Sequence, residues 1–194
     1  MTQIRPQTRD AIVEAAFQVF GRDPGASLAE VADRAGVGRA TLHRHFRGRE
    51  DLMVALAQAA TRELDAAVDA ASADAESYGA ALKAALAAVI PLADRHWFLA
   101  REPVEQDPEV MAGYQRQLRE LAEAIDAAKT EGCLDPDVPT PWIMQAFDHL
   151  VYAAWAAVRA GEATTGQAAD LAWRTLTRGL GTGGGNRTDG SDDA

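Results

Sequence analysis

The feature that most constrains the fold is the segment of residues 27–46, SLAEVADRAGVGRATLHRHF. Ser27 followed by Glu30 is a capping box, in which each residue's side chain accepts a hydrogen bond from the other's backbone N–H at the start of a helix. Gly36 and Gly38 interrupt the apolar pattern and predict a tight corner before a second helix. Two short helices joined by a glycine-containing turn form a helix-turn-helix, so we expect a helical unit that presents its second helix to DNA.

The second helix of this segment is basic, although the chain as a whole is acidic. Residues 36–49 contain four arginines, two histidines and no acid, against a total of 19 basic and 29 acidic residues. Leu42 and Phe46 lie one helical turn apart and predict the buried side. At about 100° per residue, Ala40 and Arg44 fall on the opposite side. Such a surface suits the DNA major groove, where arginine pairs with guanine and small side chains contact the thymine methyl group.

We expect the outward side of this helix to contact bases. The predicted base-contacting residues are Arg39, Ala40, Thr41, Arg44 and His45. Ser27 is predicted to touch a phosphate, because the N–H groups at a helix N-terminus attract anions. The alternative for Ser27 is a capping role alone.

A first helix over residues 8–21 completes a small three-helix core. Its apolar residues follow the spacing of an amphipathic helix. They are Ile12, Ala15, Ala16, Val19 and Phe20. Gly21 and the turn that follows it end the helix.

The segment LAEVADRAGVGRATLHRHFRGREDLMVAL, residues 28–56, resembles the DNA-binding segment of the TetR family of transcriptional repressors. The matching positions are Val31-Ala32, Ala35-Gly36-Val37, Thr41-Leu42, His45-Phe46 and Leu52. The resemblance, which covers about residues 8–56, implies an all-α protein. It implies an N-terminal three-helix helix-turn-helix DNA-binding domain at residues 6–50, and a helical effector-binding and dimerisation domain at residues 51–180.

Three positions depart from the family pattern. His43 stands where the family usually has Tyr, Arg49 where it has a phosphate-binding Lys, and Gly38 where it has Ser or Thr. His43 and Arg49 keep a polar or cationic donor, so the resemblance implies that both contact phosphate. Histidine titrates near neutral pH, which would make the His43 contact pH-dependent.

The rest of the chain predicts further helices, at about residues 48–71, 78–90, 108–132, 140–159 and 165–178.

Aromatic and sulfur-containing side chains with a few polar neighbours predict an effector pocket. Its expected residues are Trp97, Phe98, Met111, Tyr114, Met144, Phe147 and His149.

The last two helices are rich in apolar and small residues, which favours an antiparallel pair that meets its copy as a four-helix bundle. The expected dimer contacts are Leu150, Ala154, Val158, Leu171 and Leu176. Residues 181–194 have the low-complexity composition of a disordered tail.

Charge is distributed unevenly along the chain. Residues 1–52 have eight basic and seven acidic side chains, a net charge of +1, whereas residues 53–194 have a net charge of −11. DNA would therefore attract the first part and repel the second.

The sequence has no signal core, no apolar run long enough to span a membrane, and a single cysteine, Cys133, so we expect a cytoplasmic protein.

The sequence predicts a regulator and not an enzyme, with no cofactor and no metal site. It contains no GxSxG, GxGxxG or Walker motif. The favoured hypothesis is a homodimeric repressor that binds a near-palindromic operator in double-stranded DNA and is released by a small apolar or amphipathic effector. The alternatives are an activator or ligand-independent regulator with the same DNA contacts, and a helical small-molecule enzyme or carrier. The effector, the operator, the regulated genes and any redox role of Cys133 are not specified by the sequence.

Overall fold

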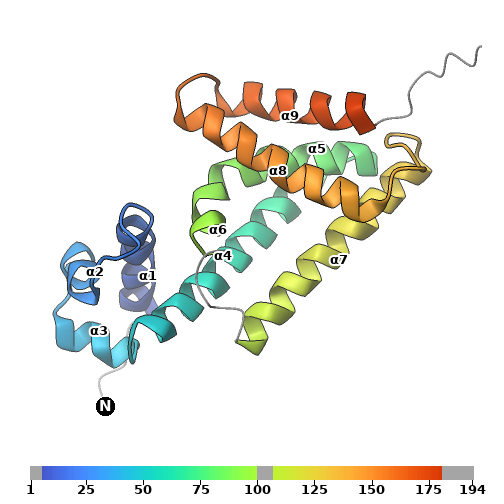
Figure 1. Ribbon diagram of the computed structural model, residues 1–194. Coiled ribbons are helices and arrows are strands. Elements are labelled where there is room, and N and C mark those ends of the chain that lie inside the picture. Colours follow the sequence, from blue (N-terminus) through green and yellow to red (C-terminus); the bar gives the residue numbers. More distant parts are fainter. Residues whose placement is uncertain (1–5, 100–106, 181–194) are drawn as a thin grey trace, which may run out of the picture. The chain divides into compact units, whose positions relative to one another are not determined.

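The computed structural model describes residues 6–99 and 107–180. Within these ranges the chain is helical and contains no strand (Figure 1). The helices are α1 (Pro6–Phe20), α2 (Leu28–Arg34), α3 (Arg39–His45), α4 (Arg49–Ser72), α5 (Tyr78–Val89), the 3-10 turn η1 (Ile90–Leu92), α6 (Ala93–Leu99), α7 (Pro108–Thr130), α8 (Thr140–Arg159) and α9 (Thr165–Leu180). The all-α prediction is confirmed, and the expected tail at residues 181–194 lies outside the described residues.

Local signals in the sequence place most helix ends correctly. At the start of α7, the Asp107 side chain accepts hydrogen bonds from the backbone N–H of Glu109 at 3.1 Å and of Val110 at 3.0 Å, as expected for an Asp-Pro helix start. Helix α8 starts differently: it has a proline in its first turn but no side-chain hydrogen bond at its N-cap. Pro139 is the N-cap of α8, and the Thr140 hydroxyl instead contacts Asp126 of α7.

The described chain forms two compact units whose sequences interleave. The first consists of residues up to 70 together with residues 91–119, and the second of residues 71–90 together with those from 120 onward. Helix α6 and the first part of α7 therefore belong to the same unit as the helix-turn-helix. The functional division at residue 50 that the resemblance implies stays a prediction.

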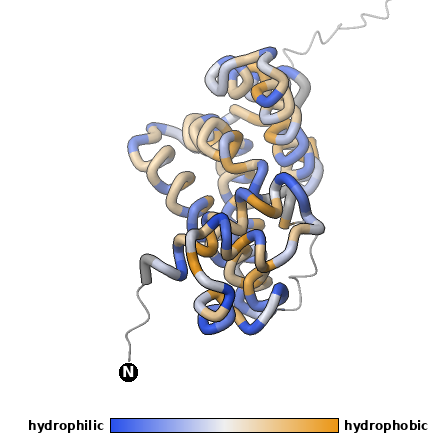
Figure 2. Tube along the Cα trace, turned by 90° about the vertical axis from the view of Figure 1, so that its left-hand side faces the viewer, coloured by the Kyte–Doolittle hydropathy of each residue, from blue (hydrophilic) through white to orange (hydrophobic). Residues whose placement is uncertain are grey.

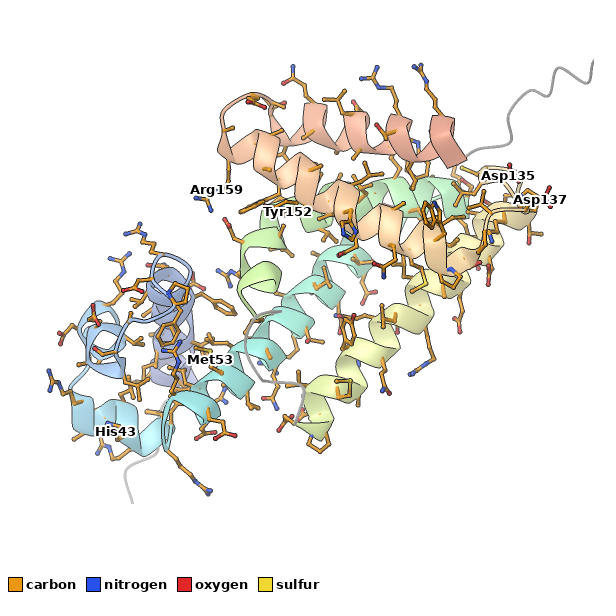
Figure 3. The ribbon with its side chains drawn as sticks, in the orientation of Figure 1. His43, Met53, Asp135, Asp137, Tyr152 and Arg159 are labelled. Carbon is orange, nitrogen blue, oxygen red and sulfur yellow. The ribbon has the colours of Figure 1, made fainter. Side chains whose placement is uncertain are left out.

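The first unit is built around one apolar cluster. Its largest members are almost inaccessible to solvent and come from α1, α3, the residue after α3, and α4: Ile12, Phe20, Leu42, Phe46, Leu52 and Leu56. Met53 of α4, which Figure 3 labels, and Leu99 of α6 belong to the same cluster. The predicted three-helix core is thus confirmed, and the first half of α4 forms a further side of it.

The second unit is formed by α5, α8 and α9 with the second half of α7. Leu82 and Leu86 of α5, Ile143 of α8 and Leu176 of α9 are buried in it. Helices α7, α8 and α9 contain both apolar and polar residues, as expected for amphipathic helices that cover a core, and Figure 2 shows both kinds of residue along the helical trace. No helix of the described ranges is long and apolar enough to cross a membrane.

Candidate nucleic-acid interface

The helix-turn-helix begins with the capping box that the sequence predicts. The backbone N–H of Ser27 donates to the Glu30 carboxylate at 2.7 Å, and the backbone N–H of Glu30 donates to the Ser27 hydroxyl at 3.3 Å. The hydrogen bonds from the Ser27 backbone and, secondarily, from its side chain hold the pKa of Glu30 below its ordinary value. Ser27 is therefore engaged in starting α2, and its hydroxyl is exposed at the helix N-terminus.

The capping box makes a testable contribution to stability at neutral pH. Because the pKa of Glu30 is lower in the folded state than in the unfolded state, its stabilisation is present above the unfolded pKa and is lost as the pH falls through the folded pKa. We expect Glu30→Gln to lower the melting temperature at pH 7. The difference from the parent should shrink as the pH is lowered through the range in which carboxylates protonate. Thermal unfolding followed by circular dichroism at a series of pH values checks this, and a difference that does not change with pH would contradict it.

The turn between α2 and α3 depends on Gly36. Its φ of +68° lies in the left-handed region, which favours glycine because it has no Cβ. Around it, the N–H of Gly36 donates to the carbonyl of Asp33 at 3.2 Å and the N–H of Val37 donates to that of Ala32 at 3.0 Å. These bonds satisfy the last carbonyls of α2 and fix the direction in which the chain enters α3.

Helix α3 is oriented as its sequence predicts. Leu42 and Phe46 are each only 1 % exposed and face the core. Arg39, Ala40, His43 and Arg44 are exposed, and Thr41 and His45 are half-buried at the edges of the same surface. Figure 3 shows His43 at the surface of α3. The structure therefore leaves all five expected base-contacting residues at least partly accessible to solvent, with Arg39, Ala40 and Arg44 the most exposed.

Two residues of this surface are hydrogen-bonded to each other. The Arg44 guanidinium donates a hydrogen bond of 3.0 Å to the Thr41 hydroxyl, one helical turn earlier. This bond restricts the Arg44 side chain while both residues stay at the surface. An arginine whose orientation is already restricted loses less conformational entropy when it binds a base.

Arg49 has a structural role that sequence analysis missed. Its guanidinium donates hydrogen bonds to the carbonyls of Ala26, at 3.0 Å, and Pro24, at 2.5 Å, and it lies 4.2 Å from the centre of the Phe20 ring. These contacts tie the start of α4 to the loop before α2. The phosphate contact predicted for Arg49 stays a prediction, and the side chain would have to make it from this position.

The role of Arg49 in the loop predicts an effect on stability. Arg49→Ala should lower the free energy of unfolding by about 1–3 kcal/mol, because it removes a cation bonded to two backbone carbonyls. Arg49→Lys should recover only part of this, since an ammonium group lacks the planar fork that reaches both carbonyls. Urea unfolding of the three proteins measures the difference. Equal stability of the alanine variant and the parent would show that these bonds contribute little.

The expected effector residues are divided between the two units. Met111 and Tyr114 lie on the part of α7 in the first unit, where Met111 is half-buried and Tyr114 is exposed. In the second unit, Phe147 is buried, Met144 is half-buried and His149 is exposed with its Nδ1 2.8 Å from the carbonyl of Gln145. Trp97 and Phe98 are in α6, but their side chains lie outside the described residues.

Trp155 of α8 is one of the aromatic residues whose composition favours a ligand cavity, and it has an unusual environment. Its indole nitrogen is buried and is the one such side-chain atom in the described ranges without a hydrogen-bond partner. The centre of its ring lies 5.3 Å from that of the Tyr152 ring and 5.1 Å from the Arg159 guanidinium. Figure 3 labels Tyr152 and Arg159. Sequence could not distinguish it from the other aromatic residues, because only tertiary packing decides which N–H is buried.

The expected dimer residues differ in their exposure. Ala154 and Leu176 are buried by neighbouring helices of the same chain, so they offer little area to a second copy. Leu150 and Val158 are half-buried, and Leu171 is exposed. Tyr152 and Trp142 of α8 are also exposed, so α8 and α9 present large apolar side chains at the surface.

Two features of the described ranges concern metal-binding groups and the environment of Cys133. They contain no group of three or more His, Cys, Asp or Glu side chains that could hold a metal ion. Burial and, secondarily, the nearby Glu131 carboxylate raise the pKa of the Cys133 thiol. A thiol with a raised pKa is less often the reactive thiolate at neutral pH.

Comparison with known proteins agrees with this geometry. Residues 12–56 match the model of the family described as bacterial regulatory proteins, tetR family. The chain is 32 % identical over 177 residues to the HTH-type transcriptional repressor LfrR of Mycolicibacterium smegmatis, a match that covers 91 % of this chain and 92 % of LfrR.

Solved structures of similar fold extend over nearly the whole chain. The crystal structure of LfrR in complex with proflavine superposes with a TM-score of 0.74 at 30 % identity, covering 91 % of this chain and 98 % of that one. A TetR family regulator from Marinobacter aquaeolei VT8 has a TM-score of 0.78 at 19 % identity, covering 93 % of this chain and 99 % of that one, and shares the fold. The helix-turn-helix with its outward basic surface, the match to the family model and the similarity to LfrR show that this chain belongs to the TetR family of bacterial transcriptional regulators.

Proposed function

We propose that this protein is a homodimeric transcriptional repressor of the cytoplasm that binds a near-palindromic operator through α3 and leaves it when a small effector binds its helical C-terminal region. The observation that carries the proposal is the outward surface of α3. Arg39, Ala40 and Arg44 are exposed there, while Leu42 and Phe46 anchor the same helix in the core. The relative LfrR is named a repressor, which supports the direction of regulation.

The proposed DNA contacts follow from position on the helix-turn-helix. Base contacts are assigned to Arg39, Ala40, Thr41, Arg44 and His45, and phosphate contacts to Ser27, His43 and Arg49. Arginine can read guanine through two hydrogen bonds, and small side chains can contact the thymine methyl group. The net charge of −11 on residues 53–194 would keep the rest of the chain away from DNA.

Two copies are needed to read a palindrome. Helices α8 and α9 pack against each other within the chain and leave Trp142, Tyr152 and Leu171 exposed, so they supply the surface on which a second copy would pack. A two-fold symmetric dimer places two recognition helices roughly 34–36 Å apart, the distance between successive major-groove faces. We therefore expect two half-sites related by two-fold symmetry.

The effector is proposed to be apolar or amphipathic, with affinity for the region that contains Phe147 and Trp155. The buried indole N–H of Trp155 could donate to an acceptor on such a ligand. The structure of LfrR contains proflavine, a planar aromatic compound, and the acidic C-terminal part of this chain favours cationic compounds of that type. An effector releases DNA only if it binds the released form better than the DNA-bound form.

A selection experiment tests the DNA-binding proposal. Purified full-length protein is used to select from a pool of random duplexes of about 40 base pairs, and the enriched sequences are read. A palindrome with half-sites about one helical turn apart is expected. Size-exclusion chromatography with light scattering should give the mass of a dimer. Failure to enrich any sequence, or a monomer at the concentrations that bind DNA, would contradict the proposal.

Ligand release is tested on the selected duplex. Proflavine is added to the protein–DNA complex, and the complex is followed by gel shift, with a duplex-only titration to account for direct binding of the dye to DNA. Loss of the complex at dye concentrations that leave an unrelated DNA-binding protein on its own site supports effector release. Retention of the complex with proflavine and with a panel of amphipathic compounds would favour a ligand-independent regulator.

A further inference from the structure

Arg95 of α6 connects three helices of the first unit. One guanidinium nitrogen lies 2.8 Å from the Glu63 carboxylate on α4, and another lies 2.8 Å and 3.0 Å from the two carboxylate oxygens of Glu14 on α1. The guanidinium is also 4.6 Å from the centre of the Phe17 ring on α1. The side chain is 28 % exposed, so these charges are only partly screened by water.

The contacts continue from α1 to α2. The Gln18 side-chain amide donates to Glu14 at 3.3 Å, and its carbonyl accepts a hydrogen bond of 2.9 Å from Arg34, at the end of α2. A continuous series of polar contacts therefore joins α6, through α1, to the helix that precedes the recognition helix. Every member of the series lies in the first unit.

Arg95 lies just after the point at which the chain enters the first unit from the second. The chain enters the first unit at Pro91, and α6 begins at Ala93, so Arg95 is in the first helix after the chain arrives from the second unit. Glu14 and Phe17 are on α1, against which α2 packs, while Glu63 is in the half of α4 beyond the apolar cluster. The guanidinium thus links α1, which packs against the helix-turn-helix, to the outer half of α4.

We propose that Arg95 is a positioning residue for DNA recognition, which holds the helix-turn-helix at the angle that two copies need in order to bind both halves of a palindrome at once. The inference rests on the proposed function. It adds a residue that never touches DNA and comes from outside the DNA-binding segment. Arginine suits the role because its planar fork can bond two carboxylates while its face stacks on an aromatic ring, which lysine cannot reproduce.

A positioning role predicts an effect that depends on the number of half-sites. A single half-site engages one recognition helix, whose angle relative to the rest of the protein does not matter. The full palindrome requires both helices at a fixed separation and angle. We therefore expect Arg95→Met to weaken binding to the full palindrome about tenfold and to leave binding to a single half-site unchanged.

The experiment measures both affinities by fluorescence anisotropy, using the palindrome selected with the parent protein and a duplex that retains one half-site. Arg95→Lys should lower the affinity for the full palindrome by less than Arg95→Met does. Glu14→Gln, which removes the Glu14 carboxylate and leaves that of Glu63, should lower this affinity by a smaller amount still. Arg62→Met is the matched control, because Arg62 is an exposed arginine on the same α4 helix that carries Glu63. Hydrogen exchange of the α1 amides should be faster in Arg95→Met than in the parent.

The outcomes separate the positioning role from the proposed function. A parent protein that selects no palindrome contradicts the proposed function and with it the role of Arg95. A parent that binds the palindrome, with Arg95→Met binding it equally well, overturns the role of Arg95 alone. Equal losses on the full palindrome and on the half-site, together with a lower melting temperature, would show that Arg95 only supports folding.

Discussion

Replacing Arg44 with alanine is expected to abolish specific operator binding while the protein stays folded. A bidentate arginine–guanine pair contributes about 1–3 kcal/mol of discrimination, and a dimer contains two such pairs. The affinity for the selected palindrome should therefore fall by about 30-fold or more, measured by fluorescence anisotropy at a fixed salt concentration. Arg44 is exposed and has no part in the core, so the melting temperature should not change.

Conservative variants separate charge from recognition. Arg44→Lys keeps the positive charge and loses the planar fork, so it should retain binding to unrelated DNA and lose preference for the operator. Thr41→Val keeps the shape and removes the hydroxyl that holds the Arg44 guanidinium at 3.0 Å, so it should cause a smaller loss at the same base pair. Operator binding by Arg44→Ala within twofold of the parent would mean that α3 does not read bases as proposed.

Replacing Phe46 with alanine is expected to unfold the helix-turn-helix or leave it marginally stable. Phe46 is 1 % exposed and is the C-cap residue directly after α3, where its backbone N–H donates to the carbonyl of Leu42 at 2.9 Å. The Arg9 guanidinium lies 5.2 Å from the centre of its ring. Truncating a buried phenylalanine costs about 3–5 kcal/mol, a large part of the stability of a typical domain.

An exposed aromatic residue in the same unit provides the control. Tyr114 of α7 is 54 % exposed, and Tyr114→Ala should change the free energy of unfolding by no more than about 0.5 kcal/mol. Urea unfolding followed by circular dichroism compares the two variants with the parent. A loss below about 1 kcal/mol for Phe46→Ala would show that the core beneath α3 tolerates its removal.

The orientation of the recognition helix was predictable because it depends on local spacing. The four-residue interval between Leu42 and Phe46 gives one helix face to the core, and the residues between them must then point elsewhere. The capping box at Ser27 and the glycine at position 36 are equally local, since their partners lie within a few residues. The structure confirms all three.

The effector and dimer residues were less predictable. An apolar residue in an amphipathic helix can face its own core, a ligand or a second copy, and periodicity does not distinguish these. Ala154 and Leu176 are buried in the protomer, whereas Leu171, assigned to the same interface, is exposed. The exposure of His149 and the burial of the Trp155 indole nitrogen likewise depend on how the helices pack.

The sequence by itself therefore determined the helical fold, the helix-turn-helix and the surface of α3 that faces outward, because hydrogen bonds and apolar contacts between near neighbours in the chain decide them. Only the tertiary structure decided what the long cationic side chains do. Arg49 bonds to a carbonyl 23 residues away and Arg95 to a carboxylate 81 residues away, and no local pattern specifies such partners. Arg49 and Arg95 therefore bond to distant parts of the first unit, while Arg44 faces outward.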